Sequence, residues 1–130
     1  MKKVALGLLV VLAGCVTEPG EWLVRVDVVG RSFAAGATIP VDVVNSSEQS
    51  ITFGACPFTL QRLEGMRWTS VQSPGPCIAI ALGLPPDESM RMQFPMAART
   101  SPGTYRLSYE FTTEGAQGLL KASSEAFAVR

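Results

Sequence analysis

The feature that most constrains this 130-residue chain is a proline–glycine turn that leads directly into alternating apolar and polar side chains. In an extended chain, side chains two positions apart lie on the same face. The segment is therefore predicted to be an antiparallel strand with one face buried and the other toward solvent. The turn is Pro102-Gly103, and the apolar residues of the strand are Tyr105, Leu107, Tyr109 and Phe111.

The same two-residue period recurs along the chain. Short alternating segments, separated by glycine and proline turns at intervals of about 8 to 12 residues, predict an all-β antiparallel sandwich of about 7–8 strands. No segment has a helical period, and no internal repeat appears. The strands are expected at residues 22–29, 39–43, 50–53, 58–63, 67–71, 89–94 and 102–111, with a closing segment at 121–129.

Four details of this pattern are further expectations. Residues 78–84 are apolar without a clear period and are predicted to be covered. Pro40 cannot donate a ladder hydrogen bond, which favours the beginning of a strand or an edge strand. Gly36 is the predicted turn residue of the connection before it. Trp68 is expected to pack in the core or against a neighbouring strand, with stacking on a ligand as the alternative.

The N-terminal segment has the pattern of an export signal. Lys2 and Lys3 are followed by an apolar run at residues 4–12, which is shorter than the roughly 20 residues that a spanning helix needs. The run ends in Leu12-Ala13-Gly14-Cys15, which resembles the lipobox of bacterial lipoproteins. The resemblance implies that residues 1–14 are removed, that the Cys15 thiol receives a diacylglyceryl group, and that the new amino terminus is acylated.

The lipobox resemblance also divides the chain and gives its location. It implies a signal peptide at 1–14, a lipidated N-terminus and short tether at 15–21, and one domain at 22–130. Acyl chains on Cys15 would hold the protein on a membrane of the bacterial cell envelope, outside the cytoplasm. Val16 stands where the enterobacterial inner-membrane retention signal has Asp, so the periplasmic side of the outer membrane is favoured in a host with two membranes. The alternative is an ordinary secretory signal in which Cys15 is incidental.

The three cysteines fit this assignment. With Cys15 lipidated, Cys56 and Cys77 remain as an even pair, and thiols outside the cytoplasm oxidise. A Cys56–Cys77 disulfide is therefore predicted. The alternative is a pair of free thiols that bind a soft metal, a site that normally recruits more than two ligands.

Composition argues against several classes of function. Eleven basic and eleven acidic residues balance, so no overall field favours nucleic acid. The chain has no histidine and therefore lacks the usual general base and the commonest metal ligand. Lys121 is the only lysine after the signal segment, which leaves little for a serine–lysine mechanism. We expect no enzyme activity, no cofactor and no small-molecule substrate.

Taken together, the strands and turns after residue 22 resemble bacterial immunoglobulin-like domains, and they are also similar to the Bacillus intracellular proteinase inhibitor, which has the same type of sandwich. The resemblance implies an immunoglobulin-like fold for residues 22–130. The antibody pattern of two distant cysteines around a tryptophan is absent. The motifs that carry the resemblance are Val43-Val44-Asn45-Ser46, Gly65-Met66-Arg67-Trp68, Leu84-Pro85-Pro86-Asp87-Glu88-Ser89 and Pro102-Gly103-Thr104-Tyr105.

The leading hypothesis is a non-enzymatic, lipid-anchored envelope module that binds another envelope protein or stabilises an envelope assembly. Its contact surface is expected where a disulfide would order the loops 54–57 and 73–77. One alternative is inhibition of an envelope protease, motivated by the resemblance and by the loop pinned between the cysteines.

A second alternative is Cu(I) binding, because thioethers are soft ligands. The candidate ligands are Met90, Met92 and Met96. The competing interpretation packs Met90 and Met92 into the core beside Phe94.

Overall fold

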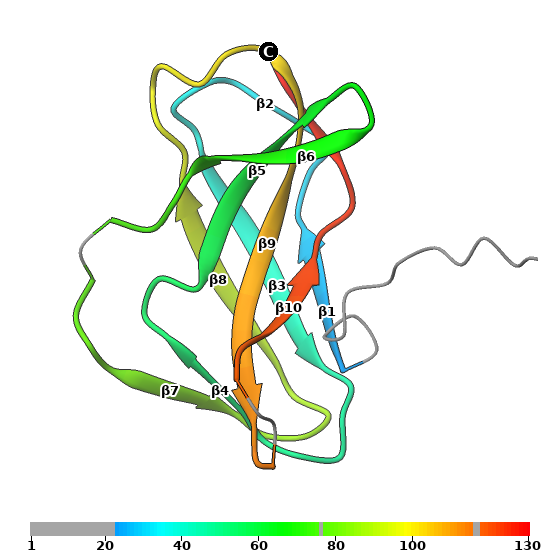
Figure 1. Ribbon diagram of the computed structural model, residues 1–130, viewed down its shortest axis with the longest axis vertical. Helices are drawn as coiled ribbons and strands as arrows, with labels where there is room; N and C mark the ends of the chain where they lie inside the picture. Colours follow the sequence, from blue (N-terminus) through cyan, green and yellow to red (C-terminus); the bar gives the residue numbers. More distant parts are fainter. Residues whose placement is uncertain (1–22, 76, 116–117) are drawn as a thin grey trace, which may run out of the picture.

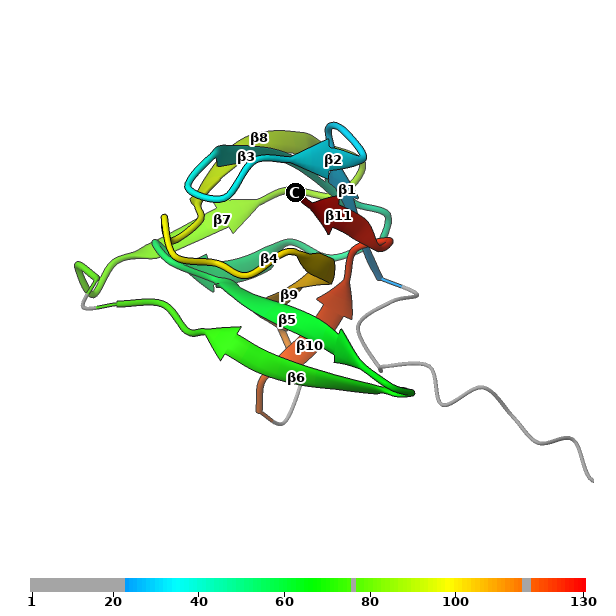
Figure 2. The same ribbon diagram turned by 90° about the horizontal axis from the view of Figure 1, so that it is seen from above.

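A computed structural model describes residues 23–75, 77–115 and 118–130. Every regular element in these residues is a strand, and the strands form two sheets packed face to face (Figure 1, Figure 2). The predicted β-sandwich is therefore confirmed. The strands are β1 Val24–Val28, β2 Ser32–Phe33, β3 Thr38–Asn45, β4 Ile51–Gly54, β5 Phe58–Glu64, β6 Arg67–Gln72, β7 Ala81–Leu84, β8 Ser89–Pro95, β9 Gly103–Thr113, β10 Leu120–Ser123 and β11 Phe127–Val129.

The eleven strands exceed the seven or eight predicted for three reasons. The two-residue strand β2 lies in a segment that was expected to be only a connection. The closing segment is divided into β10 and β11, because residues 124–126 leave the ladder. Strand β7 occupies the apolar run for which no alternation was visible.

The larger sheet is built around β9. Along one edge β9 pairs with β11 and β10, and along the other with β5 and β4. Its alternating apolar side chains are at most 1% exposed, so the predicted buried face is confirmed. Strand β9 therefore joins more of the chain than any other described strand, as the orange arrow in Figure 1 shows. The buried residues are Tyr105, Leu107, Tyr109 and Phe111.

The smaller sheet has the strand order β1-β3-β8. Ile39, Val41 and Val43 on β3 are fully buried and face β9 across the sandwich (Figure 2). Pro40 lies near the beginning of β3, as predicted, but β3 is the central strand and not an edge. The carbonyl of Pro40 accepts from the Val29 amide at 2.9 Å, beyond the end of β1. In an antiparallel ladder the N–H and C=O of one residue point the same way, so the missing N–H interrupts no pairing with β8.

The 78–84 run is not covered as predicted. Ile78 is 76% exposed and Ile80 is 46% exposed, and only Leu84 is buried. Strand β7 pairs with β4 through one of its edges and ends its sheet, so the apolar run has little to pack against. The expectation failed because a continuous apolar run does not reveal whether another layer lies over it.

Two buried tyrosines have opposite hydrogen-bonding states. The Tyr105 hydroxyl donates to the Ser101 carbonyl at 2.6 Å, the tyrosine corner of immunoglobulin-like sandwiches. The Tyr109 hydroxyl is buried and has no hydrogen-bond partner in the part of the chain that the structure describes. Burial raises the pKa of Tyr109 well above its usual value. Its ring packs against Phe58 at 5.3 Å and Phe53 at 5.6 Å between centroids.

A buried asparagine closes the bottom of the sandwich. The Asn45 amide nitrogen donates to the carbonyls of Gln49, at 2.8 Å, and Leu84, at 3.0 Å. Its side-chain oxygen accepts from the amide and the hydroxyl of Ser47. All of its polar side-chain atoms are thus satisfied, which allows Asn45 to be fully buried. The residue fixes the turn after β3 to the end of β7.

Candidate functional site: the disulfide-linked loops

A disulfide between Cys56 and Cys77 joins two loops of the larger sheet, and the predicted pairing is confirmed. Cys56 lies between β4 and β5, and Cys77 lies between β6 and β7. The two Cα atoms are 6.2 Å apart. The linked loops project along one side of the sandwich, at the left of both Figure 1 and Figure 2, and not at one of its ends. The bond fixes the loops and does not join the facing sheets.

The loop that follows Cys77 presents apolar side chains to solvent. The exposed residues Ile78 and Ile80 come between the disulfide and β7. No charged residue occurs from 77 to 84. The outer edge of β7 has no partner strand among the described residues. Such an edge offers unpaired N–H and C=O groups together with apolar side chains, which is the chemistry that an added strand of a partner protein uses.

A small apolar slot lies beside the disulfide. It has a volume of about 110 Å³ and opens between the linked loops and the end of β8. Its walls include the rings of Phe58 and Phe94, which belong to facing sheets, and the prolines Pro57, Pro74 and Pro95. Rigid prolines and a covalent bond order this surface before any partner arrives, so little entropy remains to be lost on binding. The disulfide surface is defined here as residues 54–57, 73–75 and 77–84.

The three methionines proposed as Cu(I) ligands are placed by β8 and the segment after it. Met90 and Met92 are half-buried and pack against the core on the same face as Phe94, as the competing interpretation predicts. Met96 is a buried core residue, 4% exposed. Among the described residues no group of three or more His, Cys, Asp or Glu side chains could hold a metal ion.

Trp68 lies on the solvent side of the larger sheet and not in the core. The Arg106 guanidinium of β9 lies 4.5 Å from the centre of its ring, a cation–π contact that reaches over β5. Arg106 is also held by the Gln61 side chain at 2.7 Å. Packing across strands, the first of the two predicted roles, accounts for this tryptophan.

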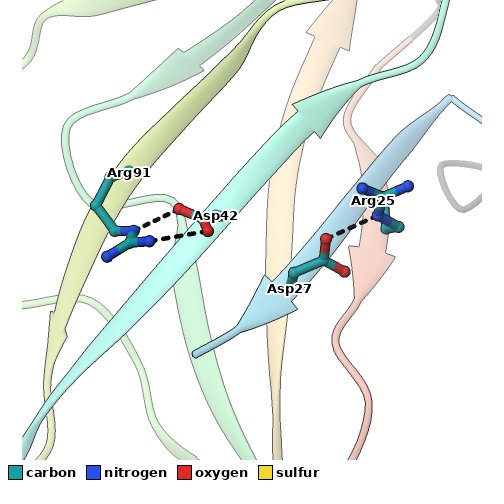
Figure 3. Close-up of polar contacts among 4 residues, drawn as sticks. All are labelled: Arg25, Asp27, Asp42 and Arg91. Carbon is teal, nitrogen blue, oxygen red and sulfur yellow. Dashed lines mark hydrogen bonds and ion pairs between the residues drawn. The ribbon is translucent and has the colours of Figure 1, made fainter. Parts of the chain in front are cut away.

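The outer face of the smaller sheet carries two ion pairs, shown in Figure 3. Asp27 and Asp42 lie opposite each other on β1 and β3, an arrangement of like charges that is unfavourable by itself. Arg25 donates to Asp27 at 2.7 Å, and Arg91 donates to Asp42 through two nitrogens. The hydrogen bond from Arg91 lowers the pKa of the Asp42 carboxyl below its usual value. The four charges balance, so this face has no excess charge to attract a ligand.

The signal peptide, Cys15 and the tether to residue 21 lie outside the described residues. Within residues 23–75, 77–115 and 118–130, no helix is long and apolar enough to span a bilayer.

Comparison with known families gives one assignment. A family model of a bacterial Ig-like domain matches residues 20–124, which include strands β1 to β10. None of the curated proteins compared with the chain matches it.

Proposed function

The chain belongs to the bacterial Ig-like domain family, and from this premise we propose that it is a non-enzymatic binding module held on the cell envelope by lipid on Cys15. Its partner is another envelope protein, which docks on the disulfide surface. The lipobox at residues 12–15 supports the anchor. In a host with two membranes, the module sits on the periplasmic side of the outer membrane.

The observation that carries the proposed contact is the exposure of Ile78 beside a disulfide. An isoleucine that is 76% exposed loses apolar contact with water when a partner covers it, and each Å² of apolar area covered contributes about 25 cal/mol. The neighbouring edge of β7 adds main-chain hydrogen bonds in the same place. Polar loops at the ends of the sandwich offer no such combination.

Site-specific photocrosslinking in intact cells tests this contact. A photoreactive side chain at Ile78 should give a discrete crosslinked species, and the same group at Met66 should not. Met66 is the matched control because it is apolar and 99% exposed, but lies at the β5–β6 turn away from the disulfide. The docking proposal is wrong if the two positions give the same products, or if neither gives any.

Mass spectrometry and cell fractionation test the anchor separately. The native protein should begin at residue 15 and carry the mass of the acyl groups. A Cys15→Ala variant should lack that mass. An unmodified Cys15 in protein purified from its native membrane would refute the anchor and leave the docking surface unaffected.

Inhibition of an envelope protease is a second candidate, favoured by one observation. Residues 77–80 form an exposed segment fixed at one end by a disulfide, as an inhibitory loop requires. Exported proteases should then lose activity in the presence of the protein, and Ile78→Asp should abolish the effect. Unchanged protease activity would leave the binding module as the function.

A further inference from the structure

A second hollow of about 310 Å³ lies between the end of β6 and the segment that joins β8 to β9. Two arginines, Arg62 and Arg99, line it, and no acidic residue does. A larger hollow of about 480 Å³, elsewhere on the molecule, is lined by Asp27, Arg31 and Glu125 and contains its own countercharges. The smaller hollow, called here the arginine hollow, has an excess of positive charge that nothing in its walls neutralises.

Arg62 occupies an unusual position for an arginine. It follows Phe58 and Leu60 on the core-facing side of β5, at the point where the sandwich opens to solvent. Its guanidinium donates to the Pro102 carbonyl at 3.3 Å and lies 6.0 Å from the centre of the Tyr105 ring. Arginines that enter the interior of a fold normally face a carboxylate. Here the anionic partner is missing from the described chain.

Gly103 makes room for this arginine. A Cβ atom at position 103 would lie 3.2 Å from the Arg62 Nε and 3.4 Å from its Nη2. The glycine therefore lets the guanidinium lie against the start of β9. Since its orientation is fixed before a ligand binds, less side-chain entropy is lost on binding.

The wall that carries Arg99 is held by the strands around it. A bulge at Val71 breaks the β5–β6 register, and Gln72 then reaches across to the segment after β8. The Gln72 side chain donates to the Pro95 carbonyl at 3.0 Å and accepts from the Ala97 amide at 2.9 Å. Within the described residues, Arg99 itself has no hydrogen bond or ion pair, so its guanidinium is available to a ligand.

We propose that the arginine hollow binds a small organic acid, whose carboxylate or phosphate lies between the guanidinium groups of Arg62 and Arg99. The planar fork of arginine matches both oxyanions through paired hydrogen bonds. The volume exceeds that of a bare ion, and Val71 and Tyr105 give an apolar wall for the rest of the ligand. This site is separate from the disulfide surface and uses none of its exposed isoleucines.

The anion can come from a free compound or from a lipid headgroup, and the fold favours the free compound. The hollow lies beside the 97–101 segment, at the top of Figure 1, whereas the described chain begins near the bottom. If the chain is anchored through Cys15, as proposed above, the hollow faces away from the bilayer that carries the anchor.

NMR titration of the full chain in an uncharged detergent tests the site, with butyrate and inorganic phosphate as probes. Both anions should shift the amide signals of residues 97–103 and the Nε–H signal of Arg62. Arg62→Gln and Arg99→Gln should each raise the dissociation constant about tenfold, because each removes a charge-assisted hydrogen bond. Arg31→Gln, which removes the same charge from the other hollow, should leave the dissociation constant unchanged.

A charge-neutral variant separates site geometry from general attraction. Gly103→Ala keeps every charge but forces Arg62 to move, so it should also weaken binding of butyrate. The proposal is overturned if no signal near the hollow moves, or if Arg31→Gln weakens binding as much as Arg99→Gln. Shifts that appear with phosphatidylglycerol vesicles but with neither free anion would overturn the assignment to a free organic acid. None of these outcomes depends on whether a partner docks on the disulfide surface.

Discussion

Replacing Tyr109 with phenylalanine should stabilise this protein, although it removes a polar group from the core. The Tyr109 hydroxyl is fully buried and has no partner among the described residues. In the unfolded chain the same hydroxyl is hydrogen-bonded to water, so folding breaks those bonds and replaces none of them. Tyr109→Phe removes this penalty and leaves the aromatic ring in place.

The magnitude follows from the contacts of the two halves of the side chain. A buried hydroxyl without a partner costs about 1–3 kcal/mol. The void left by one oxygen returns part of this, since each lost atomic contact is worth only about 0.1–0.2 kcal/mol. The ring contacts with Phe53, Phe58 and Phe111, at 5.3–5.7 Å between centroids, are unaffected. We therefore expect a net gain of about 1–2 kcal/mol in the free energy of unfolding.

Tyr105→Phe is the matched control, because it is the same chemical change two residues away on the same face of β9. The Tyr105 hydroxyl donates to the Ser101 carbonyl, so its removal should lower the free energy of unfolding by about 1 kcal/mol. Urea denaturation followed by tryptophan fluorescence measures both variants under the two-state assumption. Opposite signs are expected. A loss of stability in Tyr109→Phe would refute the reasoning, since it would mean that the hydroxyl is held by a partner.

Three further predictions concern the same core and the loops around it. Above pH 10 the stability of the wild type should fall as pH rises, because unfolded Tyr109 ionises at its ordinary pKa while burial keeps the folded hydroxyl protonated; Tyr109→Phe should remove that contribution in urea denaturation at pH 9 to 11. The Cys56→Ser, Cys77→Ser double variant should lose about 3 kcal/mol in chemical denaturation, since the disulfide closes a loop with a sequence separation of 21. Asn45→Ala should lose about 3 kcal/mol in the same assay, because it leaves the buried carbonyls of residues 49 and 84 and the Ser47 amide without partners. An Asn45→Ala change within experimental error would mean that the turn rearranges to satisfy these groups.

The sequence predicts the sandwich well because one face of each main strand must leave water. The period of two in β9 and β8 identifies their buried faces, and the glycine at position 65 marks the β5–β6 turn with its positive φ of 63°. Gly36 is likewise a turn residue, with a φ of 84°. These features are local, so they can be read from neighbouring residues alone.

The parts that the sequence did not predict depend on which strands become neighbours. Strand β2 has only two residues and exists because β11 lies beside it in parallel. The exposure of Ile78 and Ile80 follows from the place of β7 at the end of its sheet, which no local pattern specifies. Asn45 read as a turn residue, although its buried hydrogen bond to the Leu84 carbonyl spans 39 positions.

The arginine hollow escaped prediction for a related reason. Alternation alone places Arg62 on the same face as Phe58 and Leu60, which suggests a charged residue at the rim of the core. What makes it a candidate site is Arg99, 37 positions later on another connection, together with the absence of acids from the walls between them. A sequence contains both arginines but gives no indication that β6 and the segment after β8 meet.

Gln72 connects the two surfaces physically. It is the last residue of β6, lines both the apolar slot and the arginine hollow, and pins the segment after β8 through Pro95 and Ala97. The loop that begins at the next residue is fixed by the disulfide at Cys77. The end of β6 is therefore held by hydrogen bonds on one side and by a covalent bond a few residues further along the chain. A partner that shifts this loop must move Gln72 or strain the loop, and moving Gln72 alters the wall that carries Arg99.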